Sequence, residues 1–570
     1  MARPAEASPR PGAGAGRARA LLLALAAALL LNGLLSAENI WPTILIKPDH
    51  RLAPEFVLLW CLLLGAFVWR GTVGRKTLNG LAGLYLLLVL GRYLDVTVPA
   101  LFGRPVNLYW DGLQLPRFLQ VAGQALPAWA LVLGSLAALS ALVRLFLLAR
   151  AAIRCLAREA VPRAARRPAI WALTGLAVAG VLANLAGVRA TWPYISKPVL
   201  PTYFQQARVL ASAWLPGGID RALPPSPDFD GDLSGLRGAS VKLLFLESYG
   251  ATIYDNAEIA DAVRNAQQRF EQAVTSSGRQ LVSAFYRSPT FAGASDLAHL
   301  SLLSGIDLSN PLRHDILLTS QRPTLLSHFR KHGYQTIGLY PALSWAWPEK
   351  RFYGFDRFID GPALQYPGPQ IGLWYIPDQF TIAQFEQQRV ARGDTQPHLL
   401  LFPTINTHVP FRPLPPYQPD WRRILSPMPF DPDELARVLA DEPDWTRLRE
   451  PYGRSIRYTY EWLAGYMAQP WLGRDLLILI GDHQPLSGVT GPGASWDVPV
   501  HIISSDQTLL ARLVASGFEP GMNPTRESRG PMHELTEVLL RAFGGGGPDL
   551  AMPTTGAPHA VPIPKRQDWR

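Results

Sequence analysis

Two segments of the chain run from apolar residues directly into side chains that can do chemistry. The segment "LLILIGDH" ends on Asp482 and His483, and the segment "VKLLFLE" ends on Glu247. Carboxylates and an imidazole form a ligand set that suits a divalent cation such as Mn²⁺, Zn²⁺ or Mg²⁺. Each motif alone also fits a strand-to-loop turn with a capping acid. Together, at the ends of two apolar runs, they predict a metal site.

A candidate nucleophile lies in residues 288–305, "SPTFAGASDLAHLSLLSG". Gly293 permits a close approach of the backbone, and Ser295 opens a predicted amphipathic helix. A Ser at this point most often serves as a helix N-cap. The same position favours an anion, so a phosphate can be held there while the hydroxyl attacks it. His299 is four residues further along the same helix face, and we expect it to be a helix residue with satisfied hydrogen bonds rather than a ligand.

The elements that must position these side chains are apolar runs separated by helical patterns. Continuous apolar runs of this kind predict an α/β domain with a mainly parallel central sheet, covered by helices on both faces. In such sheets, ligands bind outside the carboxyl ends of the strands. We therefore expect the strand ends to converge on one edge, although they are far apart in the sequence. The five runs end at or near Glu247, Ser288, Tyr340, His408 and His483.

The composition indicates a membrane protein. Hydrophobic residues make up 48% of the 570 residues and charged residues only 17%, with a formal net charge of +10. The excess charge is mostly Arg in short segments between apolar runs, which is typical of membrane topology rather than of a nucleic-acid interface. The sequence predicts five spans by length and apolarity. Arg92 interrupts the third, and we expect it to face a bundle interior or a polar cavity. The five spans are residues 20–37, about 53–69, 81–102, 126–149 and 169–188.

Arg-rich segments set the expected orientation. They occur at the N-terminus, in the 70–76 loop and in the 150–167 loop. The positive-inside rule places these three segments in the cytoplasm, so five spans leave everything after about residue 190 outside. The expected division is a transmembrane domain over 1–190, a linker over 191–239, an extracytoplasmic catalytic domain over 240–545 and a flexible tail over 546–570.

The two cysteines, Cys61 and Cys155, both lie in the first third of the chain. The outer domain therefore has neither a disulfide framework nor a cysteine-based zinc site.

The motifs "LFLES", "GASD", "GYQTIGLYP", "NTHVPF" and "GDHQP", in this order, resemble the sulfatase-like branch of the alkaline phosphatase superfamily. The likeness is greatest to membrane phosphoglycerol transferases of the lipoteichoic acid synthase and periplasmic-glucan type, which also carry about five N-terminal spans. The resemblance implies a divalent metal, with Mn²⁺ favoured, held by Glu247, Ser295, Asp482 and His483. It also implies that Ser295 is the nucleophile and that His408 is a substrate-side histidine that assists proton transfer.

The resemblance further implies a head-group site in the segment "SWAWPEKRFYGFD". Arg351 is the expected substrate-binding residue, with Trp345 or Trp347 beside it. The spacing here departs from that of the family, so the sequence leaves the identity of the head group open.

The expected function is transfer of a phospho-head group, with phosphoglycerol favoured, from a membrane phospholipid to a periplasmic or surface glycan or another hydroxyl acceptor. The protein is expected to be a multi-pass protein of the cytoplasmic (inner) membrane that does not bind nucleic acid. Phosphoethanolamine transfer, phosphodiester hydrolysis and an inactive membrane-anchored binding module remain alternatives. A formylglycine sulfatase is disfavoured because Asp-Leu-Ala-His follows Ser295, where those enzymes need x-Pro-x-Arg.

Overall fold

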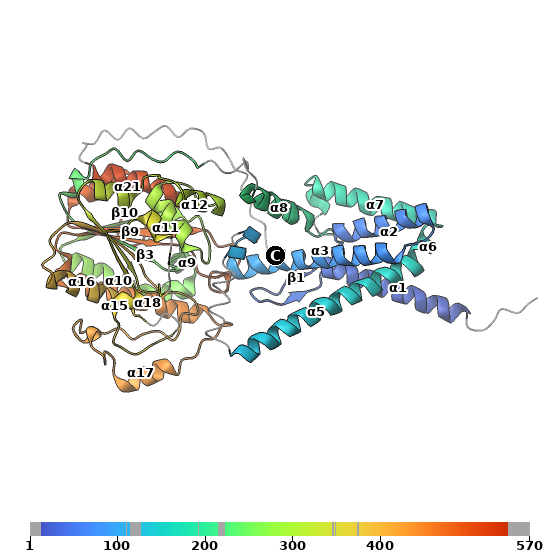
Figure 1. Cartoon of the computed structure of the whole chain (residues 1–570), viewed down its shortest axis with the longest axis horizontal. Coiled ribbons are helices and arrows are strands. Elements are labelled where there is room, and N and C mark those ends of the chain that lie inside the picture. The colour runs from blue at the N-terminus through green and yellow to red at the C-terminus, as the bar shows by residue number, and fades with distance from the viewer. Residues whose placement is uncertain are drawn as a thin grey trace, which may run out of the picture. The chain divides into compact units, whose positions relative to one another are not determined.

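The computed structural model describes residues 13–109, 111–113, 127–191, 193–214, 223–344, 347, 349–372 and 376–544. The chain forms two compact units (Figure 1). The first comprises residues 1–101 and 105–216, and the second comprises 102–104 and 217–570. The arginines expected at the extreme N-terminus, Arg3 and Arg10, and the expected tail over 546–570 lie outside the described residues.

The first unit is helical. Within its described part, four stretches are long and apolar enough to cross a membrane, namely Ala18–Ser36, Arg75–Phe102, Trp129–Ala164 and Pro168–Leu185. The expected second span forms a helix of 17 residues, which is about 26 Å long and thus shorter than a typical hydrocarbon core. The helices are α1 (Ala13–Ser36), α2 (Pro54–Arg70), α3 (Arg75–Phe102), α5 (Ala128–Cys155), α6 (Val161–Ala164), α7 (Pro168–Leu185) and α8 (Leu200–Trp214), with a short hairpin of β1 (Glu38–Asn39) and β2 (Ile46–Lys47) after α1.

Polar contacts mark the two ends of the helical unit. At one end, Arg150 donates from Nε to Oδ1 of Asn79 at 2.6 Å, so the Arg-rich segments that flank α3 and α5 share this end. At the other end, Arg92 is buried and donates to the carbonyl oxygens of Ala37 at 2.8 Å and Lys197 at 3.2 Å. Arg92 therefore faces the interior of the unit, where it satisfies carbonyls just beyond α1.

The second unit is built on one sheet, which has nine strands in the part of the chain that the structure describes. The path is β10-β4-β9-β8-β3-β7-β5-β6, and β11 pairs with β4. All strands except β9 and β10 run in the same direction, which confirms the predicted mainly parallel sheet. The strands are β3 (Val241–Leu246), β4 (Gln280–Arg287), β5 (Gln335–Tyr340), β6 (Arg357–Asp360), β7 (His398–Pro403), β8 (Leu476–Gly481), β9 (Asp497–Ser504), β10 (Glu519–Pro520) and β11 (Ser528–Pro531).

Helices cover both faces of this sheet (Figure 1). On one face, Leu244 of β3 shares a buried core with Phe270 of α10 and Trp462 of α18. On the other face, the ring of Phe245 lies 4.2 Å from that of His299 on α11, because successive strand residues point to opposite faces. The helices are α9 (Thr252–Asp255), α10 (Ala257–Ser276), α11 (Ser295–Ser304), α12 (Pro311–Leu318), α13 (Leu325–Lys331), α14 (Lys350–Tyr353), α15 (Gly361–Leu364), α16 (Asp378–Ala391), α17 (Pro432–Leu439), α18 (Arg449–Met467), α19 (Ser487–Thr490), α20 (Gln507–Ala515) and α21 (Leu535–Phe543).

Candidate active site

Two adjacent strand ends bring Glu247 and Asp482 together. β3 and β8 pair in parallel with Leu246 opposite Gly481, so the next residue of each strand leaves the sheet beside the other. The turn after Glu247 fixes this arrangement, because Ser248 adopts a left-handed conformation with φ 54° and donates its N–H to Oδ1 of Asp482 at 2.8 Å. The parallel sheet therefore places two buried carboxylates side by side.

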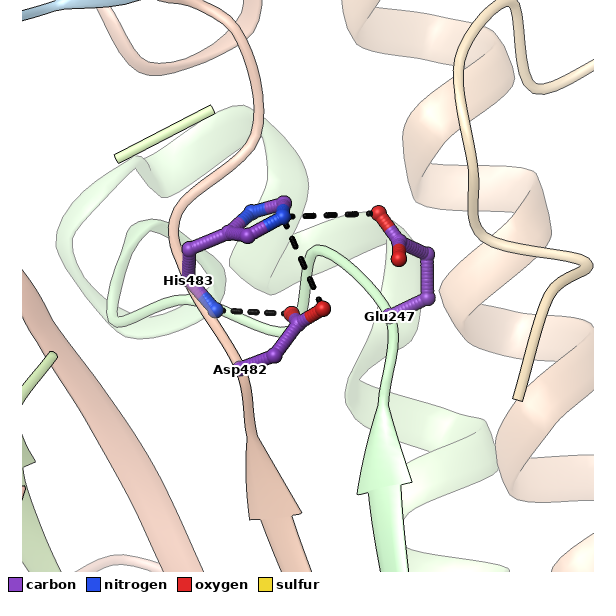
Figure 2. Close-up of side chains that lie close together, drawn as sticks. All are labelled: Glu247, Asp482 and His483. Carbon is purple, nitrogen blue, oxygen red and sulfur yellow. Dashed lines mark hydrogen bonds and ion pairs between the residues drawn. The ribbon is translucent and has the colours of Figure 1, made fainter. Parts of the chain in front are cut away.

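His483 completes a group of three potential metal ligands (Figure 2). One ligand atom each of Glu247, Asp482 and His483 lies within 4.8 Å of the others, and all three residues are buried. His483 donates from Nδ1 to the carbonyl oxygen of Gln484 at 2.9 Å, so Nε2 keeps its lone pair for a metal. That nitrogen lies 3.7 Å from Oε1 of Glu247 and 3.5 Å from Oδ2 of Asp482.

The electrostatics of this group fit a cation. Burial, and then the charge of Asp482, raise the pKa of Glu247 well above its usual value. Two buried carboxylates this close destabilise each other unless a positive charge or a proton lies between them. The three side chains thus suit a divalent cation in ligand type, spacing and charge.

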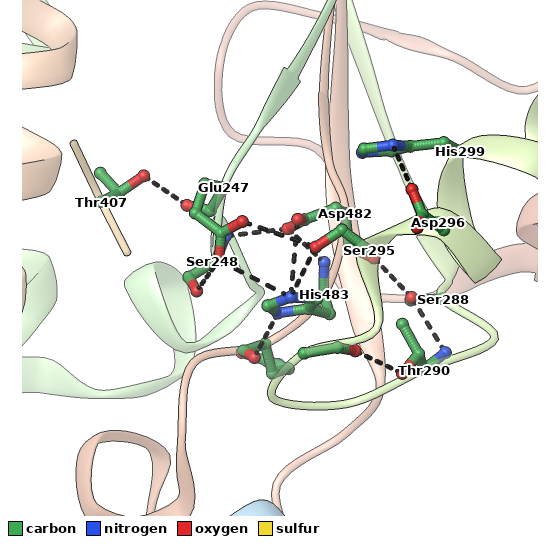
Figure 3. A network of polar contacts seen from close by, with 12 residues as sticks. Glu247, Ser248, Ser288, Thr290, Ser295, Asp296, His299, Thr407, Asp482 and His483 are labelled. Atoms are coloured by element: carbon green, nitrogen blue, oxygen red, sulfur yellow. Dashed lines mark hydrogen bonds and ion pairs between the residues drawn. The ribbon is translucent and has the colours of Figure 1, made fainter. Parts of the chain in front are cut away.

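Ser295 lies at the edge of this ligand group (Figure 3). Its Oγ is 3.2 Å from Nε2 of His483 and 3.5 Å from Oε2 of Glu247. Ser295 is the first residue of α11, and the N-cap is Ala294, so Ser295 does not have the N-cap role that its position favoured. The hydroxyl is directed to the metal ligands instead of to the backbone of its own helix.

The loop before Ser295 has an unusual backbone. Ala292, Gly293 and Ala294 have φ values of 55°, 127° and 61° in succession. A left-handed conformation costs a residue with a side chain roughly 1–2 kcal/mol, and such conformations concentrate at functional sites. The sharp turn that these three residues make brings the first turn of α11 against the ligand group.

Hydrogen bonds fasten this loop to the segment that carries the metal ligands. Ser288 donates from Oγ to the carbonyl oxygen of Asp482. Ala292 donates its N–H to the carbonyl oxygen of Gln484 at 3.1 Å, the same oxygen that accepts from His483. Sequence reasoning missed Ser288 and Gln484 as positioning residues, although Gln484 directly follows His483.

The segment after β7 holds the turn of Glu247 from the other side. The N–H of Glu247 donates to Oγ1 of Thr404 at 3.1 Å, and Oγ1 of Thr407 donates to the carbonyl oxygen of Glu247. His408 follows in this segment and donates from Nδ1 to the carbonyl oxygen of Val409 at 2.8 Å. Burial lowers the pKa of His408, on which the charges of His483 and Asp482 also act. His408 therefore lies near the ligand group without being one of its three members.

The residues expected to hold a head group lie in different environments. Arg351 is exposed on α14 and has no hydrogen bond or ion pair with a described residue. Trp347 is 6% exposed, and its ring packs against Tyr340 at 5.0 Å and Tyr353 at 4.9 Å. No contact among the described residues joins either one to Ser295, and Trp345 lies outside the described residues. A substrate-binding role for Arg351 and Trp347 stays a prediction.

His299 differs from its expected role. It is buried, and neither ring nitrogen has a hydrogen-bond partner in the described part of the chain. Its Nδ1 lies 4.0 Å from Oδ1 of Asp296, the residue that follows Ser295. His299 lies on α11 as expected, but the expectation that its hydrogen bonds are satisfied is wrong.

A comparison with protein-family models agrees with the sequence motifs. The Sulfatase family model matches residues 246–507, which confirms the resemblance to the sulfatase-like branch and covers Glu247, Ser295, His408, Asp482 and His483. Comparison with curated proteins gave no match.

Solved structures show a remote likeness to this chain. The lipoteichoic acid synthase LtaP from Listeria monocytogenes is 14% identical, with a TM-score of 0.32 over 52% of this chain and 70% of that one. The phosphoglycerol transferase GacH from Streptococcus pyogenes, in complex with sn-glycerol-1-phosphate, is 11% identical, with a TM-score of 0.31 over 56% and 94%. The periplasmic domain of EcEptC from Escherichia coli is 12% identical, with a TM-score of 0.31 over 50% and 77%.

Proposed function

We propose that the protein is a metal-dependent transferase. It moves a phospho-head group from a membrane phospholipid to a hydroxyl acceptor, and its reaction centre lies in the region that matches the Sulfatase family model, residues 246–507. The observation that carries the proposal is the position of the Ser295 hydroxyl, 3.2 Å from His483 and 3.5 Å from Glu247 at the start of α11. A helix N-terminus favours a phosphate, and the adjacent hydroxyl can attack it.

Glu247, Asp482 and His483 would hold the metal, with Ser295 beside it. The family resemblance favours Mn²⁺, and the same ligands accept Zn²⁺ or Mg²⁺. When bound, such a cation makes a neighbouring hydroxyl more acidic and neutralises charge on phosphoryl oxygens. The raised pKa of Glu247, caused by burial and by Asp482, supports a cation at this place.

The proposed reaction has two steps. Ser295 Oγ forms a bond to the phosphorus, the bond from phosphorus to the diacylglycerol oxygen breaks, and diacylglycerol leaves with a proton. An acceptor hydroxyl then forms a bond to the same phosphorus, the Oγ–phosphorus bond breaks, and the proton of the acceptor returns to Ser295. The imidazole of His408, whose pKa is lowered by burial, is the nearby group suited to carry that proton.

The helical unit supports a lipid donor, because four of its described helices suit a membrane. We further propose that the catalytic unit is extracytoplasmic at the inner membrane, with a periplasmic or surface glycan as the acceptor. The shared location of the Arg-rich segments near Asn79 and Arg150 supports this orientation. It requires that α2 cross the membrane although it is short.

The first test is to trap the intermediate. The purified, Mn²⁺-loaded full chain is incubated with vesicles of head-group-labelled phospholipid and digested for mass spectrometry. We expect the label on the peptide that contains Ser295. The label should be lost in Ser295→Ala. It should be retained in Ser309→Ala, the control, which changes an exposed Ser beyond the end of α11. Release of free labelled head-group phosphate that added glycan does not reduce would favour a hydrolase over a transferase.

A further inference from the structure

Asp296 places a negative charge directly beside the nucleophile. Its side chain is 34% exposed. It turns away from Glu247 and toward His299 (Figure 3). A phosphate that reaches Ser295 would therefore meet a carboxylate on the side opposite the metal ligands. A carboxylate on the residue next to the nucleophile repels the phosphate unless a positive group lies between the two.

Beside Asp296 lies a buried polar side chain that has no hydrogen bond to a described residue, that of His299. His299 is 3% exposed, packs against Phe245, and has two ring nitrogens without hydrogen bonds to the described residues. Burial lowers the pKa of His299, and the charges of Asp296 and Asp482 act on it. An imidazole nitrogen without a hydrogen bond can accept one from a donor held at Asp296.

Two tyrosines whose rings both pack on Trp347, Tyr340 and Tyr353, have buried hydroxyls without a hydrogen-bond partner among the described residues. Burial raises the pKa of Tyr340 and of Tyr353, and the charge of Asp296 raises both further. Glu349 also acts on Tyr353. Aromatic faces beside carboxylates are the surroundings that a cationic amine prefers.

Two basic residues of α14 are exposed, and one of them contacts an aromatic ring. Lys350 and Arg351 are exposed on α14, and the Lys350 ammonium lies 5.0 Å above the ring of Phe358. Phe358 belongs to the same aromatic cluster, since its ring packs against Tyr340 at 5.4 Å. One face of this cluster thus already binds an ammonium group of the chain itself.

We propose that Asp296, backed by His299, Tyr340 and Tyr353, binds an ammonium group on the transferred head group. This rests on the proposed function and narrows its substrate class to aminated phospholipids, so that phosphoethanolamine is transferred in preference to phosphoglycerol. The ammonium group takes no part in bond making or breaking. It neutralises Asp296 beside the phosphate, which the uncharged hydroxyls of glycerol cannot do.

A competition experiment tests this. The metal-loaded full chain is mixed with vesicles that contain equal amounts of phosphatidylethanolamine and phosphatidylglycerol, and the two adducts on Ser295 are separated by mass. We expect the phosphoethanolamine adduct to exceed the phosphoglycerol adduct by roughly tenfold or more, the effect of one charge-assisted hydrogen bond. Asp296→Asn should lower that ratio by a similar factor, whereas Asp261→Asn, an exposed acid on α10, should leave it unchanged.

Companion variants separate recognition from folding. Asp296→Glu keeps the charge and should keep most of the preference, and Tyr353→Phe should reduce it more than Tyr334→Phe, which removes a buried hydroxyl away from Asp296. Metal content and melting temperature show that each variant is folded. A wild-type adduct that is mainly phosphoglycerol, or an unchanged ratio in a folded Asp296→Asn, overturns this inference alone. No adduct on Ser295 from either lipid overturns the proposed function and this inference together.

Discussion

Gln484 occupies the space that a side chain on Gly250 would need. A Cβ on Gly250 would lie 2.8 Å from the Cα of Gln484 and still closer to its amide group. The Gln484 side chain is itself held, since it accepts from the N–H of Thr252 at 3.2 Å and donates to the carbonyl oxygen of Ser495 at 3.0 Å. The turn that follows Glu247 therefore packs directly on the residue that orients His483.

Gly250→Ala should disturb the metal centre without touching a ligand. The added methyl group must displace Gln484, whose carbonyl oxygen holds both the imidazole of His483 and the loop before Ser295. We expect a loss of stability of about 1–3 kcal/mol, as for other overpacked cores, together with weaker metal binding and lower activity. Thermal melts and metal analysis measure these effects. Gly231→Ala is the control, because nothing lies within 4 Å of its added Cβ; equal behaviour of the two variants would contradict the coupling.

Removal of a metal ligand should abolish activity without unfolding the protein. Glu247→Ala, Asp482→Ala and His483→Ala should each lose metal and activity while the fold is retained, because the charge that stabilises the phosphoryl oxygens is lost. Glu247→Gln should also melt higher than the wild type when both are metal-free at pH 8. A carboxyl with a raised pKa destabilises the folded state above its unfolded pKa, and the amide removes that cost. An Asp482→Ala protein with full metal content and activity would exclude the site.

Ser295→Ala should lose activity but keep the metal, since three ligand side chains remain. Ser295→Thr retains a hydroxyl at the start of α11 and should keep part of the activity. Activity assays and metal analysis on the same preparations distinguish the two effects. Comparable activity in Ser295→Ala and the wild type would remove Ser295 from the reaction.

Asp378 predicts a pH dependence of stability. It is buried and accepts from the N–H groups of Ile405 at 2.8 Å and Asn406 at 3.0 Å, which fixes the start of the segment that carries His408. Burial raises its pKa from 3.8 to about 7. The folded state thus binds the proton more tightly than the unfolded state, so this group's contribution to stability is lost as the pH rises from about 4 to about 7.

Asp378→Asn should flatten this dependence. The free energy of unfolding of the wild type relative to that of the variant should change by a few kcal/mol between pH 4 and pH 8, which is the free energy that corresponds to the pKa shift of Asp378. Denaturant melts at several pH values measure it. Parallel pH profiles for the two proteins would show that Asp378 is ionised throughout.

The orientation in the membrane is testable with fusions. A reporter that works only outside the cytoplasm should be active after residue 200 and inactive at residue 160, within the Arg-rich segment. Activity at 160 but not at 200 would place the catalytic unit in the cytoplasm. A reporter in the 70–76 loop addresses α2 directly, because that loop is cytoplasmic only if α2 crosses the membrane.

The sequence predicted those parts of the fold that follow local patterns. The apolar runs that end at Glu247 and His483 form β3 and β8, because strands buried on both faces are apolar throughout. The antiparallel strand β9 lies between β4 and β8, and no local pattern indicates that order. Strand order depends on pairing between distant segments, which periodicity does not report.

In the candidate site, too, the residues that follow a local sequence pattern could be predicted and the others could not. Glu247, Ser295, Asp482 and His483 were identified because each stands at the end or start of an element. Gln484 was missed because its contribution is a backbone carbonyl. The packing of Trp347 against Tyr340 and Tyr353 could not be predicted, because the sequence does not show which rings meet in the fold.

The neighbouring positions of Ser248 and Asp482, 234 residues apart in the chain, set the order in which the centre can assemble. The pairing of β3 with β8 closes a long loop, and contacts of such large sequence separation form slowly. Once β3 and α11 have been synthesised, Glu247 and Ser295 are present, but Asp482 and His483 are added only when almost the whole catalytic unit exists. Tight metal uptake is thus a property of the finished chain, and it distinguishes a full-length product from every fragment that stops before Asp482.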